Sequence, residues 1–177
     1  MKLKKAFYLR PTLEVAQDLI GKFLVHRTDS EIYRAQIIET EAYAGFDDLA
    51  CHGARGKTER NKVMFRQGGC AYVYIIYGIH HCLNIVTEEE GYPSAVLIRA
   101  LEYPDADGPG KVCRRFKIAK KTHNGVGLTG DVLWLEDHEQ KPELVSDKRI
   151  GIDYAGQSTD WPWRFYRAKS SSNEYLT

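Results

Sequence analysis

The sequence has few of the features that mark secreted, membrane-bound or metal-binding proteins. Its four cysteines (Cys51, Cys70, Cys82 and Cys113) are scattered, and no two of them form a C-x-x-C pair. This spacing favours reduced thiols over a disulfide framework or a zinc site. No apolar run is long enough to span a membrane, and no signal-peptide-like apolar segment follows the N-terminal lysines. We therefore expect a protein that is not secreted, has no membrane partner, and needs no metal or other cofactor.

Strong net charge and internal repeats are also absent. The 177 residues carry a formal net charge of +1, so the overall charge indicates no particular partner. A chain of this length is typical of one domain with a sizeable core. We expect a single domain over residues 1–177, with a polar tail from about residue 170, and a monomer in solution.

Alternation of apolar residues predicts a chain made mainly of strands. We expect strands at residues 22–27, 33–43, 94–101, 132–136 and 164–167, and a β-hairpin within residues 69–86. One helix should run from Thr12, as its N-cap, to Gly21, and a basic helix from about Asp107 to Lys121. Because strands outnumber helices and follow one another in hairpin order, we predict an α+β fold. It would be a compact domain with a curved, mostly antiparallel sheet, a protruding β-hairpin and peripheral helices.

The predicted hairpin has a bulky apolar tip. Its two strands meet at Tyr77-Gly78, which is followed by Ile79 and His80. Turn tips usually carry small polar residues, so the tyrosine either folds back onto the protein or stands out as a wedge. A stiff ribbon with an apolar wedge is what a protein needs to unstack a nucleic-acid base.

Positive charge is concentrated in two parts of the chain. Basic residues recur from Arg55 to Arg66 and again from Lys111 to Lys121, and no acid interrupts the second run. A single charged run usually marks a solvated face. Two such runs, together with an aromatic hairpin tip, favour a surface that binds phosphates.

Glu39, Glu41 and Tyr43 are predicted to share one face of a strand, because they are two residues apart. A buried carboxylate is costly unless it is paired, and Arg99 interrupts another apolar strand where it could supply a structural ion pair. Alternatively, a glutamate here activates a water molecule. The residues alone leave both interpretations open.

Flat rings accompany these carboxylates in the chain. Rings of this kind suit a planar, cationic group held by stacking, and they belong to Tyr43, His52, Tyr72, Tyr74, His80 and His81. Adjacent histidines at His80-His81 face opposite ways in a strand, which argues against a metal cluster there.

Several ordered blocks of the sequence resemble the alkyladenine (3-methyladenine) DNA glycosylases, which remove alkylated purines from DNA. The densest blocks are IIETEAYAG, the stretch from His52 to Phe65, AYVYIIYGIHHCLNIV and VLIRALE. The resemblance implies that family's compact mixed fold, whose β-hairpin enters the minor groove. It implies a monofunctional enzyme of base excision repair that flips alkylated or deaminated purines out of double-stranded DNA. Hydrolysis of the N-glycosidic bond would leave an abasic site, with no lyase activity, in the bacterial cytoplasm or a eukaryotic nucleus.

The resemblance also implies catalytic and DNA-contacting roles. Glu41 would be the general base, Arg99 would help to hold the attacking water, and the Ile150 carbonyl would be a further ligand of that water. The DNA-binding residues would be Tyr77, Ile79, His80, Met64, Arg60 and Lys111. A non-catalytic module that binds damaged nucleic acid is the alternative. The presence of both Glu41 and Arg99 counts against it.

The same resemblance implies how a substrate base would be held. The flipped purine would stack on Tyr43 from one side and on His52 and Tyr74 from the other. Asn84 would hinder the exocyclic amine of guanine, and Tyr77 would fill the gap that the flipped base leaves in the duplex.

Overall fold

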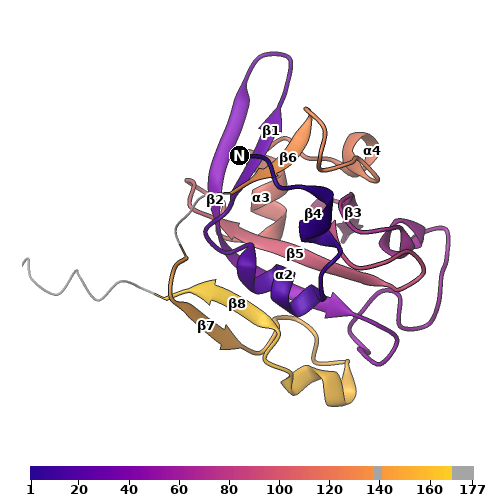
Figure 1. Cartoon of the computed structure of the whole chain (residues 1–177). Coiled ribbons are helices and arrows are strands. Elements are labelled where there is room, and N and C mark those ends of the chain that lie inside the picture. Colours follow the sequence, from indigo (N-terminus) through magenta and orange to yellow (C-terminus); the bar gives the residue numbers. More distant parts are fainter. Residues whose placement is uncertain (138–140, 169–177) are drawn as a thin grey trace, which may run out of the picture.

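The centre of the fold is an eight-stranded antiparallel sheet, seen in a computed structural model that describes residues 1–137 and 141–168 (Figure 1). Its strands are β1 (Phe23–Arg27), β2 (Ile32–Ala44), β3 (Ala71–Ile76), β4 (His80–Val86), β5 (Ser94–Leu101), β6 (Leu133–Glu136), β7 (Leu144–Asp147) and β8 (Arg164–Arg167). Their order is β3-β4-β5-β2-β1-β6, and β8 pairs with both β2 and β7. The predicted α+β fold with a mostly antiparallel sheet is confirmed.

The long strand β2 bends the sheet. Residues 32–36 pair with β1, whereas residues 37–44 pair with β5, and β8 joins at residues 39–41. The register with β5 shifts on both sides of Glu39. An irregularity of this kind bends a strand and increases its twist. The second half of β2 therefore pairs with different strands from the first half.

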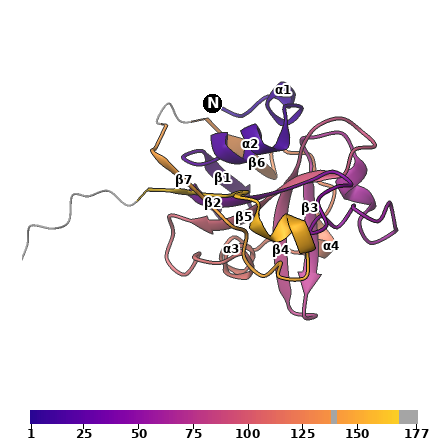
Figure 2. The same cartoon turned by 90° about the horizontal axis from the view of Figure 1, so that it is seen from below.

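Short helices cover the two faces of the sheet. The strands lie between α2 (Thr12–Asp18) and α3 (Pro109–Arg115) in Figure 2. Both helices contribute fully buried side chains to the main core, among them Val15 and Val112. The remaining short elements are α1 (Lys5–Tyr8), α4 (Lys120–His123) and the 3-10 turns η1 (Lys62–Phe65) and η2 (Gly156–Asp160). No helix in the described ranges is long and apolar enough to cross a membrane.

The hairpin of β3 and β4 extends beyond the rest of the molecule (Figure 2). Its turn is closed by the Ile79 N–H, which donates to the Ile76 carbonyl over 3.2 Å. Tyr77 and Gly78 both have left-handed backbone conformations, with φ of 53° and 75°. Glycine adopts this conformation freely, but for a bulky residue it costs about 1–3 kcal/mol. Tyr77 is 90% exposed as a residue, so its side chain does not fold back into the core.

The predicted basic helix is shorter than its charge pattern suggested. It ends at Arg115, and α4 begins only at Lys120. Between them Lys117 has a φ of 55°, and the Ile118 N–H donates to the Cys113 carbonyl over 2.8 Å. This is a Schellman ending, in which the left-handed position is usually glycine. Because this position holds a lysine and not a glycine, the sequence pattern did not indicate where the helix ends.

Two other local predictions differ from the structure. Thr12 is the first residue of α2 and not its cap; its hydroxyl bonds instead to Thr87 and Glu88. Strand β7 was not predicted, because its residues are only partly buried and show no apolar face. The polar tail expected from about residue 170 lies outside the described residues.

Candidate active site

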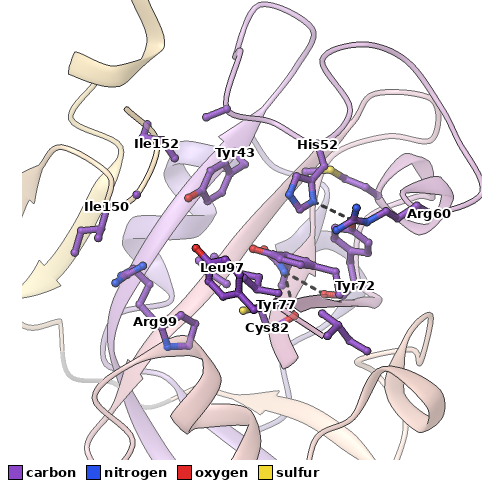
Figure 3. A pocket seen from close by; sticks show the side chains of 18 of the residues that line it. Tyr43, His52, Arg60, Tyr72, Tyr77, Cys82, Leu97, Arg99, Ile150 and Ile152 are labelled. Carbon is purple, nitrogen blue, oxygen red and sulfur yellow. Dashed lines mark hydrogen bonds between the residues drawn. The ribbon is translucent and has the colours of Figure 1, made fainter. Parts of the chain in front are cut away.

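A cavity of about 350 Å³ lies between the β3–β4 hairpin and the segment that follows β7. Its size falls within the range of small-molecule sites, roughly 300–1,000 Å³. The predicted site residues that line it are Tyr43, His52, Arg60, Met64, Tyr74, Tyr77, Asn84 and Arg99. In Figure 3, Tyr43, Arg99 and Ile150 lie along one side of the cavity, and His52, Arg60 and Tyr72 lie along the other.

Glu41 is held at this site by two hydrogen-bond donors and one ion-pair partner. The residue is 0% exposed. Its Oε1 accepts the Ile150 backbone N–H over 2.7 Å, and its Oε2 accepts the Tyr43 hydroxyl over 2.7 Å. Arg99 Nη1 lies 3.4 Å from Oε2. Burial raises the pKa of Glu41 above its ordinary value, although Arg99, the Ile150 N–H and the Tyr43 hydroxyl each act to lower it. The side chain therefore has a fixed orientation and a raised affinity for a proton.

The structural ion pair considered for Arg99 is present, and Glu39 is its closer partner. Arg99 Nε donates to Glu39 Oε1 over 3.1 Å. Arg164 on β8 reaches the same oxygen over 3.2 Å. Glu39 thus anchors Arg99 from one side while Arg99 Nη1 faces Glu41. Arg99 therefore forms the ion pair with Glu39 and also lies next to Glu41.

Aromatic rings form the opposite wall. The His52 and Tyr74 rings lie 4.5 Å apart between centroids, at an interplanar angle of 73°. His52 Nδ1 is 3.0 Å from the Tyr72 hydroxyl. His52 remains exposed at the mouth of the cavity, yet the protein atoms around the ring, and secondarily the Arg60 guanidinium, lower its pKa. At neutral pH this imidazole is therefore uncharged.

The other residues predicted to contact substrate or DNA are divided between the cavity and the outer surface. Asn84 is buried, and its Nδ2 donates to the Tyr72 carbonyl over 3.2 Å. Met64 is also buried, so it lines the cavity and does not lie on the outer surface. Ile79 and His80 are exposed on the hairpin, outside the cavity.

Lys111 is exposed and does not line the cavity. It pairs with Asp107 over 2.8 Å, one turn earlier in the chain. The start of α3 nevertheless packs against the hairpin, since a Cβ at Gly110 would lie 3.3 Å from the His80 Cβ. This approach places the start of α3, which carries Lys111, beside the first residue of β4.

Sequence reasoning missed the residues that support the site from behind. Asn61 Nδ2 donates to the His52 carbonyl over 2.8 Å and to the Gly56 carbonyl over 3.0 Å, which fixes the His52 loop. Asp48 and Arg149 form a buried ion pair next to Tyr43. The Thr58-x-x-Asn61 pattern could have indicated a local turn, but no local signal joins Asp48 to Arg149. No group of three or more metal-ligating side chains occurs among the residues described.

Comparison with known proteins identifies the family. Residues 6–171 match the family model described as Methylpurine-DNA glycosylase (MPG). A protein of Anaeromyxobacter sp. strain Fw109-5 is 49% identical, over 93% of this chain and 88% of the relative. Relatives from Alkaliphilus oremlandii and Methanocella arvoryzae are 47% and 45% identical, over 94% and 95% of this chain and 95% and 93% of their own. All three carry the name "Putative 3-methyladenine DNA glycosylase". With the family match spanning most of the chain, this protein belongs to the methylpurine-DNA glycosylase family.

Proposed function

We propose that this protein is a monofunctional DNA glycosylase that flips alkylated or deaminated purines out of duplex DNA and hydrolyses their N-glycosidic bond. The observation that carries the proposal is the position of Glu41. A fully buried carboxylate lies beside an aromatic cavity, and an exposed tyrosine stands at the tip of the neighbouring hairpin. Enzymes that act on a base inside a duplex need such a pocket for the extruded nucleotide.

Glu41 is the proposed general base. Each carboxylate oxygen already accepts one hydrogen bond, from Ile150 or from Tyr43, and an ionised carboxylate has about four acceptor sites in all. Glu41 therefore keeps acceptor capacity for a water molecule on the side of Arg99. Because the residue is 0% exposed, that water can reach it only when the side chains that cover Glu41 move as the substrate binds. The water oxygen attacks C1′ while its proton passes to Glu41, and the electron pair of the breaking bond leaves with the base. The transition state resembles an oxocarbenium ion, as in other glycoside hydrolysis.

The cavity walls fit a planar and positively charged base. Tyr43 lines one side and His52 and Tyr74 the other. Because the His52 and Tyr74 rings are inclined at 73°, only one of these two can stack face-on with a planar base, and each good cation–π contact contributes about 0.5–2 kcal/mol. Because the pKa of His52 is lowered, its neutral ring does not repel a cationic alkylpurine. Asn84 is the proposed source of discrimination against guanine, since its side chain lines the same cavity.

Tyr77 is the proposed wedge. Its exposed ring at the hairpin tip would replace the extruded base in the stack, with Ile79 and His80 beside it in the groove. Arg60, at the cavity rim, and Lys111, at the start of α3, would meet phosphates. The strained backbone of Tyr77 agrees with this role, because strain of this kind concentrates at functional sites.

The proposed product is an abasic site in an intact strand. A lyase reaction needs an amine that can form a Schiff base with C1′. No lysine is among the described residues that line the cavity, which supports a water nucleophile with Glu41 as its proposed base.

The test is a set of duplexes that each carry one defined lesion, incubated with the protein in the presence of EDTA. We expect free base and strand breaks that appear only after heat or alkali. Binding to lesion duplexes without release of any base would support the non-catalytic alternative and overturn the proposal. Strand cleavage without heat or alkali would overturn the assignment as a monofunctional enzyme.

A further inference from the structure

A buried ion pair lies behind the candidate site. The side chains of Asp48 and Arg149 are both 0% exposed, and two hydrogen bonds of 2.6 Å and 2.8 Å join them. Neither residue lines the cavity. Buried ion pairs are costly to desolvate and often stabilise a fold no better than apolar residues of similar size. A contribution to stability alone therefore does not account for this pair.

The pair connects separate segments of the chain. Arg149 also donates to the carbonyls of Ala42 over 2.9 Å and Ser158 over 3.1 Å. Asp48 accepts the backbone N–H of Ala44 over 3.2 Å. The end of β2, the loop after it and the segment from β7 to η2 are thus joined through one guanidinium and one carboxylate.

Both hydrogen-bond donors to Glu41 belong to the segments that this pair joins. Ile150 directly follows Arg149, and its N–H donates to Glu41 over 2.7 Å. The Arg149 guanidinium carbon lies 4.8 Å from the centroid of the Tyr43 ring, whose hydroxyl donates to Glu41 over 2.7 Å. Ala42, the backbone partner of Arg149, is the residue between Glu41 and Tyr43.

We propose that Asp48 and Arg149 are positioning residues that hold the Ile150 N–H and the Tyr43 hydroxyl on Glu41. The inference rests on the proposed function, in which Glu41 is the base. It assigns to the pair a role in catalysis without contact to substrate. Arg99, the ion-pair partner of Glu41, is independent of the pair, because Glu39 anchors it.

The charged and titratable groups around Glu41 determine what loss of the pair should do. They are Glu39 and Tyr43 on β2, Arg99 on β5, Tyr74 on β3 and, through Glu39, Arg164 on β8. All of these remain in a variant of the pair. The Ile150 and Tyr43 donors lower the pKa of Glu41, so loosening them raises it further. The pH at which base release begins should therefore move upward by about 0.5–1 unit, the equivalent of one ordinary hydrogen bond.

The experiment measures single-turnover release of 7-methylguanine from a duplex across pH, for wild type, Asp48→Asn and Arg149→Lys. Lysine keeps the charge but cannot reproduce the two-pronged contact. We expect the acid limb of both variants to move to higher pH and the plateau rate to fall about 10- to 100-fold. The matched control is Lys148→Gln, which removes an exposed ion pair with Asp160 next to Arg149 in the chain. It should leave the acid limb and the plateau rate unchanged.

A double variant, Asp48→Leu with Arg149→Met, separates positioning from folding. Apolar replacement of a buried pair commonly keeps the fold stable. We expect this variant to melt below the wild-type temperature, because the Ala42 and Ser158 carbonyls and the Ala44 N–H lose their partners, but to stay folded in the assay while its acid limb stays shifted. A wild-type acid limb in the folded variants would overturn the proposal, as would failure of the double variant to fold, which would make the pair a determinant of the fold.

The proposed function is tested separately in the same series. If wild type releases no base, the proposed function fails. If wild type releases base, Glu41→Gln does not, and the Asp48 and Arg149 variants behave as wild type, only the positioning role fails.

Discussion

Removing the exposed ring of Tyr77 should weaken base flipping and leave the fold intact. Tyr77 is 90% exposed as a residue, so Tyr77→Ala removes almost no packing inside the protein. Stacking on a base contributes about 1–3 kcal/mol, and each 1.36 kcal/mol corresponds to a factor of ten. We therefore expect excision of a fully paired lesion to slow by about 5- to 150-fold.

A second substitution separates the ring from its backbone. Tyr77 has a φ of 53°, a conformation that asparagine tolerates better than tyrosine. Tyr77→Asn should raise the free energy of unfolding by about 1 kcal/mol, measured by urea denaturation, and still lose the flipping function. Stability and activity would then change in opposite directions at one residue.

The assay compares single-turnover excision of one lesion in a paired duplex with the same lesion in a mismatch or single strand. A base that is already unstacked needs no wedge, so the loss should be much smaller there. Ile32→Ala is a suitable control, since Ile32 is 59% exposed at the start of β2 and does not line the cavity. Equal losses on paired and unpaired lesions would refute the reasoning and make Tyr77 a structural residue.

Three further predictions concern protonation. Burial raises the pKa of Glu41 above its ordinary value of 4.5, so the stability that this group contributes is complete below pH 4.5 and is lost as the pH rises through the raised pKa. Urea denaturation at a series of pH values should therefore show that Glu41→Gln gains stability relative to wild type as the pH rises through this range. Arg60→Gln should raise the pKa of His52, followed by NMR titration of the imidazole, because it removes a nearby positive charge. Release of 7-methylguanine, a cation that leaves without an acid, should rise with pH to a plateau, whereas release of neutral hypoxanthine should be bell-shaped. Matching bell-shaped curves for the two bases would contradict this account of leaving-group protonation.

The sequence predicts the main strands because each has a strong local signal. Alternation marks β3 and β4, and the apolar run with Arg99 marks β5. The end of α3 and the strand β7 have no such signal. Lys117 occupies a position where glycine is usual, and β7 is only partly buried. The end of α3 depends on a local Schellman turn without its usual glycine, and β7 depends on its pairing with β8, a tertiary contact that a local pattern does not contain.

The candidate site, like the fold, was predictable from the sequence only where a local pattern exists. The period of two places Glu39, Glu41 and Tyr43 on one face, and the structure has all of them near Arg99 or in contact with one another. The partner of the other Glu41 oxygen is a backbone N–H at residue 150, which no side-chain pattern can reveal. The Ile150 carbonyl was the group expected near the water. The group that the structure places on Glu41 is the N–H of the same residue.

The most direct test of the central claim is Glu41→Gln in single-turnover excision, with lesion-duplex affinity measured in parallel. Glutamine keeps the shape of the side chain and one acceptor oxygen but cannot take a proton from water. We predict that the variant binds a 7-methylguanine duplex about as tightly as wild type and releases no base above the uncatalysed rate. Base release close to the wild-type rate would contradict the assignment of Glu41 as the general base.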